Sequence, residues 1–193
     1  MKPLRRLLER IGSFRGDAAG VAAVEFALIL PMMLLLYVGT VEASALISMD
    51  RRVQSIAGAV GDLVARSNVN LAACDLKDYF QAAAGIMAPY TSDPVQQIVS
   101  SVQVKADGTT IVAWSQAAGG ATAHNVGDAY PLPQAMKDIS LSAYVIVSEA
   151  SYSYSPITKL IYSQAIQLRR ENFYSPRFGG SIVINPTSTS ACP

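Results

Sequence analysis

The stretch that decides the fold is GVAAVEFALILPMMLLLYVGTV, residues 20–41. Between Val21 and Val41 its only ionisable side chains are those of Glu25 and Tyr37. About 20 apolar residues are what an α-helix needs to cross the hydrocarbon core of a membrane. The stretch therefore predicts a membrane-spanning helix. The carboxylate needs an explanation, because on insertion scales a charge inside a membrane helix costs about 3 kcal/mol.

The charges that flank this run predict its direction across the membrane. Residues 1–20 carry five basic side chains against two acidic ones. After the run, the nearest basic residues are Arg51 and Arg52. Because the more positive flank stays in the cytoplasm, we expect the N-terminus inside and everything after about residue 45 exported. The charged residues of the first segment are Lys2, Arg5, Arg6, Glu9, Arg10, Arg15 and Asp17.

Three interpretations of this region follow from the sequence. The first is a plain single-pass anchor, with a tolerated proline kink and with Glu25 reaching the membrane surface. The second is a secretory signal peptide cut after the small residues at 43–45, which would release a protein that begins at Leu46. The third places the cut before the apolar run, between Gly20 and Val21, and leaves the helix on the mature protein.

The third interpretation explains why a carboxylate is kept in the helix. Cleavage would make Val21 the new N-terminus and would put its ammonium one helical turn from Glu25. In an assembled bundle, the ammonium of one subunit would pair with Glu25 of its neighbour. Such a pair would set the axial register of the helices and would favour a subunit that is packed against another helix.

A known processing signal has the same layout. A basic leader that ends in a small residue, followed by an apolar helix with Glu at its fifth position, resembles the signal of type IV prepilins. More specifically, the run GVAAVEFALILPMMLLLYVG, with its AVEFAL core and the Leu-Pro after it, is similar to the N-terminal signature of TadE-like proteins. These are pseudopilins of the tight-adherence (Tad, Flp) pilus system. The resemblance implies cleavage between Gly20 and Val21 by a prepilin peptidase, and a register role for Glu25.

The resemblance also implies a function, partners and a location. The function is that of a minor pilin-like subunit in pilus assembly, and not that of an enzyme. The partners are a prepilin peptidase, the major Flp-type pilin, other minor pseudopilins, the inner-membrane assembly platform and membrane lipid. The location is the bacterial inner membrane, with a single pass, a cytoplasmic N-terminus and a periplasmic head. The alternative is a periplasmic binding module, anchored or cut free, with no filament role.

Nucleic acid is not an expected partner, because the formal net charge is only +1 and no basic field is present. The expected organisation is a leader over residues 1–20, a transmembrane helix over residues 21–41 and an exported head over residues 42–193. The head should begin with an amphipathic helix over residues 42–66, because apolar side chains recur there at helical spacing. These side chains are Met49, Val53, Ile56, Val60 and either Leu63 or Val64.

The helical pattern then gives way to strands. A second, shorter helix is expected within residues 71–89, since Pro89 ends it. Alternating residues on both sides of Asp107-Gly108 predict a hairpin, with strands over residues 98–105 and 110–114.

The rest of the chain completes a small antiparallel sheet. Residues 117–133 predict a loop, and residues 134–139 a short helix. Residues 141–156 predict a central strand that begins with both faces apolar. A turn or helical piece after Pro156, a strand around Ile166 and Leu168, and a short strand in SIVI should follow. The expected fold is α+β and pilin-like, with a long N-terminal helix, a short second helix and an antiparallel sheet.

The cysteines, the histidine and the tyrosines predict little chemistry. Cys74 and Cys192 lack the close spacing of a zinc or thioredoxin-like motif. In an oxidising compartment they would form a disulfide worth about 4 kcal/mol in the chain-entropy model; the alternative is two independent cysteines. The one histidine, His124, lies in a glycine-rich loop without a ligand cluster, so no catalytic residue, metal or cofactor is expected. Tyr152 and Tyr154 are expected to be buried strand aromatics.

Overall fold

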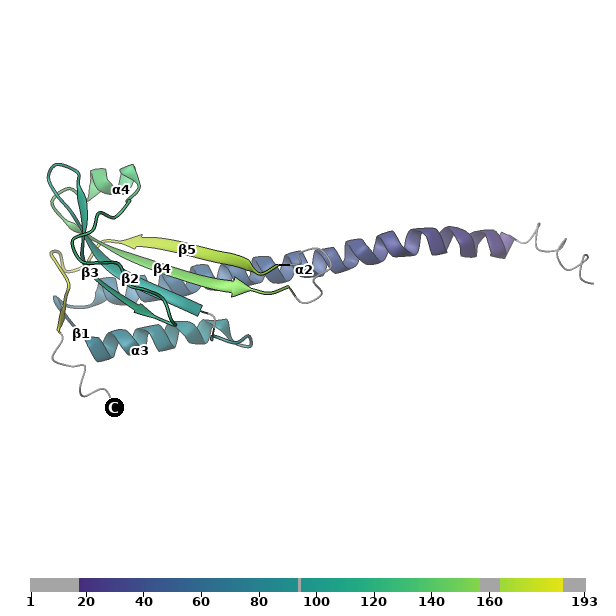
Figure 1. Ribbon diagram of the computed structural model, residues 1–193, viewed down its shortest axis with the longest axis horizontal. Coiled ribbons are helices and arrows are strands. Elements are labelled where there is room, and N and C mark those ends of the chain that lie inside the picture. Colours follow the sequence, from purple (N-terminus) through teal and green to yellow (C-terminus); the bar gives the residue numbers. More distant parts are fainter. Residues whose placement is uncertain (1–17, 94, 157–163, 186–193) are drawn as a thin grey trace, which may run out of the picture. The chain divides into compact units, whose positions relative to one another are not determined.

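The computed structural model describes residues 18–93, 95–156 and 164–185 (Figure 1). The chain divides between Ala45 and Leu46 into two compact units, which are described separately. Helix α2 (Ala18–Arg66) contributes residues to both units. The predicted long N-terminal helix and its end near Arg66 are therefore confirmed. Residues 1–17 of the predicted leader, and the piece expected directly after Pro156, lie outside the described residues.

The second unit begins with the amphipathic half of α2. The predicted apolar stripe is buried, and Leu63 beside it is only half-buried. The buried members, each at most 2% exposed, are Met49, Val53, Ile56, Val60 and Val64. The second predicted helix follows as α3 (Ala73–Ala84), which continues into a short 3-10 turn, η2 (Gly85–Met87).

Four antiparallel strands form the main sheet, in the order β3-β2-β4-β5. The predicted hairpin is present around the Asp107-Gly108 turn, and β4 lies between two other strands, as expected of a central strand. The predicted α+β class is therefore confirmed. The strands are β2 (Val95–Val104), β3 (Thr110–Ala118), β4 (Tyr144–Tyr154) and β5 (Ile166–Tyr174).

The two faces of the sheet are covered by different parts of the chain. On one face, Gln97 of β2 donates a hydrogen bond of 3.1 Å to the carbonyl oxygen of Phe80 in α3. The predicted burial of Tyr152 and Tyr154 is confirmed. The other face is covered by the segment between β3 and β4, which includes α4 (Gln134–Ile139). Between this segment and the sheet lies an apolar core. Its buried residues are Val102, Val104, Val112, Tyr130, Leu132, Val145 and Val147, and Met136 and Phe173 pack against them.

A second, two-stranded sheet was not predicted. The expected final strand is present as β6 (Val183–Asn185), but it pairs in parallel with β1 (Asn70–Ala72). Leu71 and Ala72, expected in the second helix, are therefore strand residues. These two residues are extended because they form backbone hydrogen bonds with β6, a strand far away in the sequence, and α3 begins only after them. Asn185 lies opposite Ala72 in this pairing.

One row of residues on α2 contacts a row of residues on β5 and on the segment that follows β5. Four residues of an α-helix advance about 6 Å, and two residues of a strand advance about 6.6 Å, so the two rows stay level over the three pairs that involve β5. Figure 1 shows β5 running beside α2. The contacts, in chain order, are Asp50 with Arg170, Gln54 with Asn172, Gly58 with Tyr174, and Asp62 with Arg177. This matching fixes where the helix lies on the sheet.

Tyr174 makes the closest approach in this row. Its hydroxyl donates to the carbonyl oxygen of Gly58 at 3.1 Å, and its ring lies over Gly61. A Cβ at position 61 would come within 2.4 Å of the ring, whereas a Cβ at position 58 would lie 3.5 Å from the tyrosine oxygen. The space for the ring therefore depends on Gly61 and not on Gly58.

We expect Gly61→Ala to lower the free energy of unfolding by about 1–3 kcal/mol, because the added methyl forces the tyrosine ring out of its place. The matched control, Gly58→Ala, should raise the free energy of unfolding by up to about 1 kcal/mol, since alanine is the better helix former and finds room there. Denaturant unfolding of the full chain in detergent measures both. Equal effects of the two substitutions would contradict this account of the helix–sheet contact.

Candidate functional site

The N-terminal part of α2 has an apolar surface that its own unit leaves uncovered. All residues from Gly20 to Leu36 are exposed. The helix is long and apolar enough to cross a membrane by length and composition, and none of its most apolar window is buried. Exposed apolar surface of this extent marks contact with lipid or with other proteins. This arrangement is consistent with membrane anchoring through the predicted segment.

The predicted processing and register residues lie at the start of this surface. Gly20, Val21 and Glu25 are all helical and exposed. Val21 and Glu25 are four residues apart, which corresponds to about 6 Å along the helix axis. The carboxylate of Glu25 thus lies on the same exposed helix as the apolar side chains of residues 26–36, where a partner helix can reach it.

Of the two cysteines in the predicted disulfide, the structure describes only Cys74. Cys74 lies in the first turn of α3 and is partly buried. Cys192 lies outside the described residues. The pairing of the two cysteines therefore stays a prediction.

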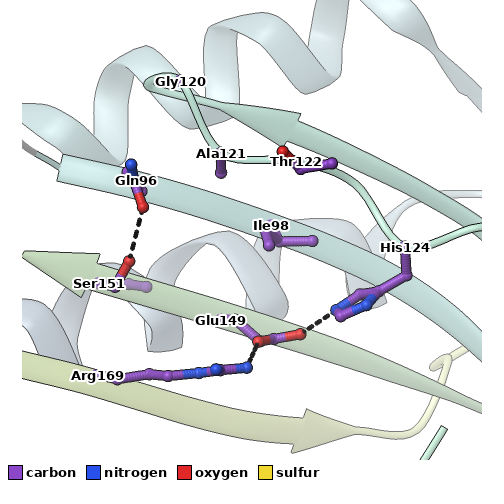
Figure 2. A pocket seen from close by; sticks show the side chains of 10 residues that line it. Gln96, Ile98, Gly120, Ala121, Thr122, His124, Glu149, Ser151 and Arg169 are labelled. Atoms are coloured by element: carbon purple, nitrogen blue, oxygen red, sulfur yellow. Dashed lines mark hydrogen bonds and ion pairs between the residues drawn. The ribbon is translucent and has the colours of Figure 1, made fainter.

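A polar cluster in the second unit surrounds Glu149 of β4, whose side chain is only 4% exposed. Its Oε1 lies 2.6 Å from Nε2 of His124 and accepts a hydrogen bond of 3.0 Å from the hydroxyl of Tyr130. Its Oε2 accepts from the guanidinium of Arg169 on β5. Figure 2 shows His124 and Arg169 approaching the carboxylate from opposite sides. Because an ionised carboxylate only accepts, His124 is the donor in its contact.

These partners determine the charge state of Glu149. Burial by itself would raise the pKa of the Glu149 carboxyl, but the hydrogen bonds from His124 and Tyr130 and the positive Arg169 hold this pKa below its usual range. Glu171 lies directly opposite Glu149 in the β4–β5 pairing. Partial desolvation and the charge of Glu149 raise the pKa of Glu171. Burial, together with both carboxylates, also raises the pKa of Tyr130.

The sequence did not predict this cluster. Its members come from the loop after β3 and from two strands, so no local motif joins them. His124 was expected to have no ligand cluster, which is true of its neighbours in sequence, yet the fold brings Glu149 to it. One signal was available, since Glu149 interrupts the most apolar strand of the chain. A buried carboxylate in such a strand calls for donors from elsewhere.

The described residues hold no group of three or more metal-ligating side chains. The cluster is instead a carboxylate held by a histidine, a tyrosine and an arginine. It fastens the loop after β3 to the sheet, because His124 and Tyr130 both belong to that loop. The backbone N–H of His124 adds a hydrogen bond of 3.1 Å to Oγ of Ser115.

The fold and the exposed helix define a class: an α+β unit that carries a long apolar N-terminal helix suited to membrane anchoring. In a comparison with known families, residues 20–61 match the family model of TadE-like proteins. The resemblance to TadE-like proteins is thus confirmed over these residues. The family is a structural one, associated with Tad pili, and not an enzyme family. No curated protein and no solved structure matches the chain.

The position of Glu149 generates a prediction on stability against pH. Because the pKa of Glu149 is lowered by folding, its ionised form stabilises the protein above about pH 4.3, the ordinary pKa of glutamate. This stabilisation is lost as the pH falls through the lowered pKa. We expect Glu149→Gln to lower the free energy of unfolding at neutral pH by about 1–3 kcal/mol and to flatten the decline of stability in acid.

Glu171→Gln is the matched control, because the pKa of the Glu171 carboxyl is raised, whereas the pKa of Glu149 is lowered. It should leave stability at neutral pH unchanged or raise it, because it removes a negative charge opposite Glu149. Denaturant midpoints of both variants across acid and neutral pH are the measurement. If Glu149→Gln and Glu171→Gln have the same effect, the cluster does not act as described.

Proposed function

We propose that the protein is a minor pilin-like subunit, a pseudopilin, in the assembly of a Tad/Flp-type adhesive pilus. The observation that supports this most is the exposed apolar helix with Glu25 near its start, which coincides with the family match beginning at Gly20. In this proposal, residues 1–20 are the leader, residues 21–41 cross the inner membrane and residues 42–193 form the periplasmic head. The N-terminus is cytoplasmic.

Processing and register follow from this proposal. A prepilin peptidase cuts between Gly20 and Val21, and the new ammonium of one subunit pairs with Glu25 of its neighbour. An unpaired carboxylate in the membrane costs about 3 kcal/mol, so the pair favours the assembled state over the isolated helix. The protein is thus a substrate of an enzyme and not an enzyme itself.

Neighbouring helices pack through the exposed apolar surface of α2. Between helices in lipid, association depends on close van der Waals contact, for which small residues leave room. Ala27 and Gly39 lie within this segment. The proposed partners are the major Flp-type pilin, other minor pseudopilins and the inner-membrane assembly platform, in addition to lipid.

We also propose the disulfide between Cys74 and Cys192, and the β1–β6 pairing supports it. Asn185 is opposite Ala72, two residues before Cys74. Cys192 is seven residues beyond Asn185, and seven extended residues span up to about 25 Å, so the two cysteines are within reach of each other. Intact mass after alkylation, with and without reduction, tests the pairing. Two alkylated cysteines in the unreduced, exported protein would rule it out.

A binding module without a filament role is the competing proposal, and Glu25 separates the two. We expect Glu25→Ala to leave membrane insertion intact or improved, because it removes a charge from the helix, and to cause a large loss of piliation in a strain that needs this protein. Membrane fractionation and counts of pili by electron microscopy measure the two effects.

Thr40→Val is the matched control. It also removes a polar group from α2, a hydroxyl that donates to the carbonyl oxygen of Leu36 at 2.8 Å, but it removes no charge. It should leave piliation unchanged. Normal piliation with Glu25→Ala would contradict the register role and favour the binding module.

A further inference from the structure

A hollow of about 340 Å³ lies beside Glu149 on the sheet of the second unit. It is bounded by strands β2, β4 and β5 and by the start of the loop that follows β3 (Figure 2). Its volume falls within the range of small-molecule sites, about 300–1,000 Å³. We call it the Glu149 hollow. Its lining includes the polar residues Gln96, Thr122, Ser151 and Arg169 and the apolar residues Ile98 and Ala121.

The polar side chains of the Glu149 hollow keep hydrogen-bonding capacity for a ligand. Oγ of Ser151 donates to Oε1 of Gln96 at 3.3 Å, which leaves the two N–H groups of that amide. Arg169 has five N–H donors, and among the described residues its side chain binds only Glu149. The hydroxyls of Ser151 and Thr122 can accept as well as donate. The hollow therefore offers donors and acceptors together.

The charges of the lining select against an ionic ligand. Arg169 and His124, which also lines the hollow, are both paired with the negative Glu149. An anion in the Glu149 hollow would meet the carboxylate, and a cation would meet the guanidinium. A neutral ligand avoids both penalties.

Hydroxyl groups fit this lining best, because each one donates and accepts at the same time. The C–H groups of such a ligand can pack against the apolar part of the lining, Ile98 and Ala121. We propose that the Glu149 hollow binds a neutral, hydroxyl-rich ligand of monosaccharide size, with the Gln96–Ser151 pair bonded to neighbouring hydroxyls. This recognition function does not depend on the proposed filament role.

The test uses the full chain in a detergent without a sugar headgroup, since a maltoside would compete for the site. The probes are glucose, galactose, mannose and N-acetylglucosamine, observed by saturation-transfer NMR and titration calorimetry. We expect at least one of them to bind with a millimolar or lower Kd. The double variant Gln96→Ala with Ser151→Ala should weaken that binding at least about tenfold, because the ligand hydroxyls lose two hydrogen-bonding partners.

The chain offers a matched control pair on the same sheet. Nε2 of Gln167 donates to Oγ of Ser153 at 3.0 Å, outside the lining of the hollow. Gln167→Ala with Ser153→Ala should leave the affinity unchanged. Thermal unfolding of both double variants checks that each remains folded.

Three outcomes would overturn the proposal. The first is no binding of any of the four sugars at millimolar concentration. The second is binding that the two double variants weaken equally. The third is tighter binding of the charged analogues gluconate or glucosamine than of glucose, which would mean that the lining selects an ion.

Discussion

The second unit depends on one contact. One row of α2 residues lies against a row of residues on β5 and on the segment that follows β5. In the three pairs that involve β5, helix residues at intervals of four meet strand residues at intervals of two, so the helix lies along the strand instead of crossing it. Beside this row, the stripe from Met49 to Val64 is buried. Each fully buried side chain of this kind contributes about 1.5–3 kcal/mol. The row fixes where the stripe lies, and the burial of the stripe stabilises that placement.

The two parts of α2 differ in burial, and the pattern of apolar residues differs with it. From Val21 to Leu36 its residues are all exposed and, apart from Glu25, apolar, whereas from Met49 onward only one side is apolar and that side is buried. Asp50 and Asp62, on the polar side, pair with Arg170 and Arg177. The change in pattern along α2 is consistent with a helix whose first part anchors the chain in a membrane and whose last part packs in the core of the second unit.

Local features of the fold could be predicted from the sequence, and distant pairings could not. The apolar stripe, the turn at Asp107-Gly108 and the short helix over residues 134–139 follow from periodicity and turn chemistry within a few residues. The pairing of β1 with β6 could not be predicted, because it joins segments more than 100 residues apart. The donors around Glu149 were missed because they lie on other elements, 19–25 residues away in the sequence, and no local pattern joins them to Glu149. For Gly61 the sequence holds no sign of the Tyr174 ring that requires it.

The central claim is that the chain is trimmed before its apolar run and keeps α2 as a membrane helix. The most direct test is the intact mass and N-terminal sequence of the protein purified from membranes of cells with their native assembly system. The account predicts a start at Val21. A start at Leu46 would contradict it, because the apolar helix would then be a discarded signal peptide. A start at Met1, in cells whose peptidase processes the major pilin, would contradict it equally.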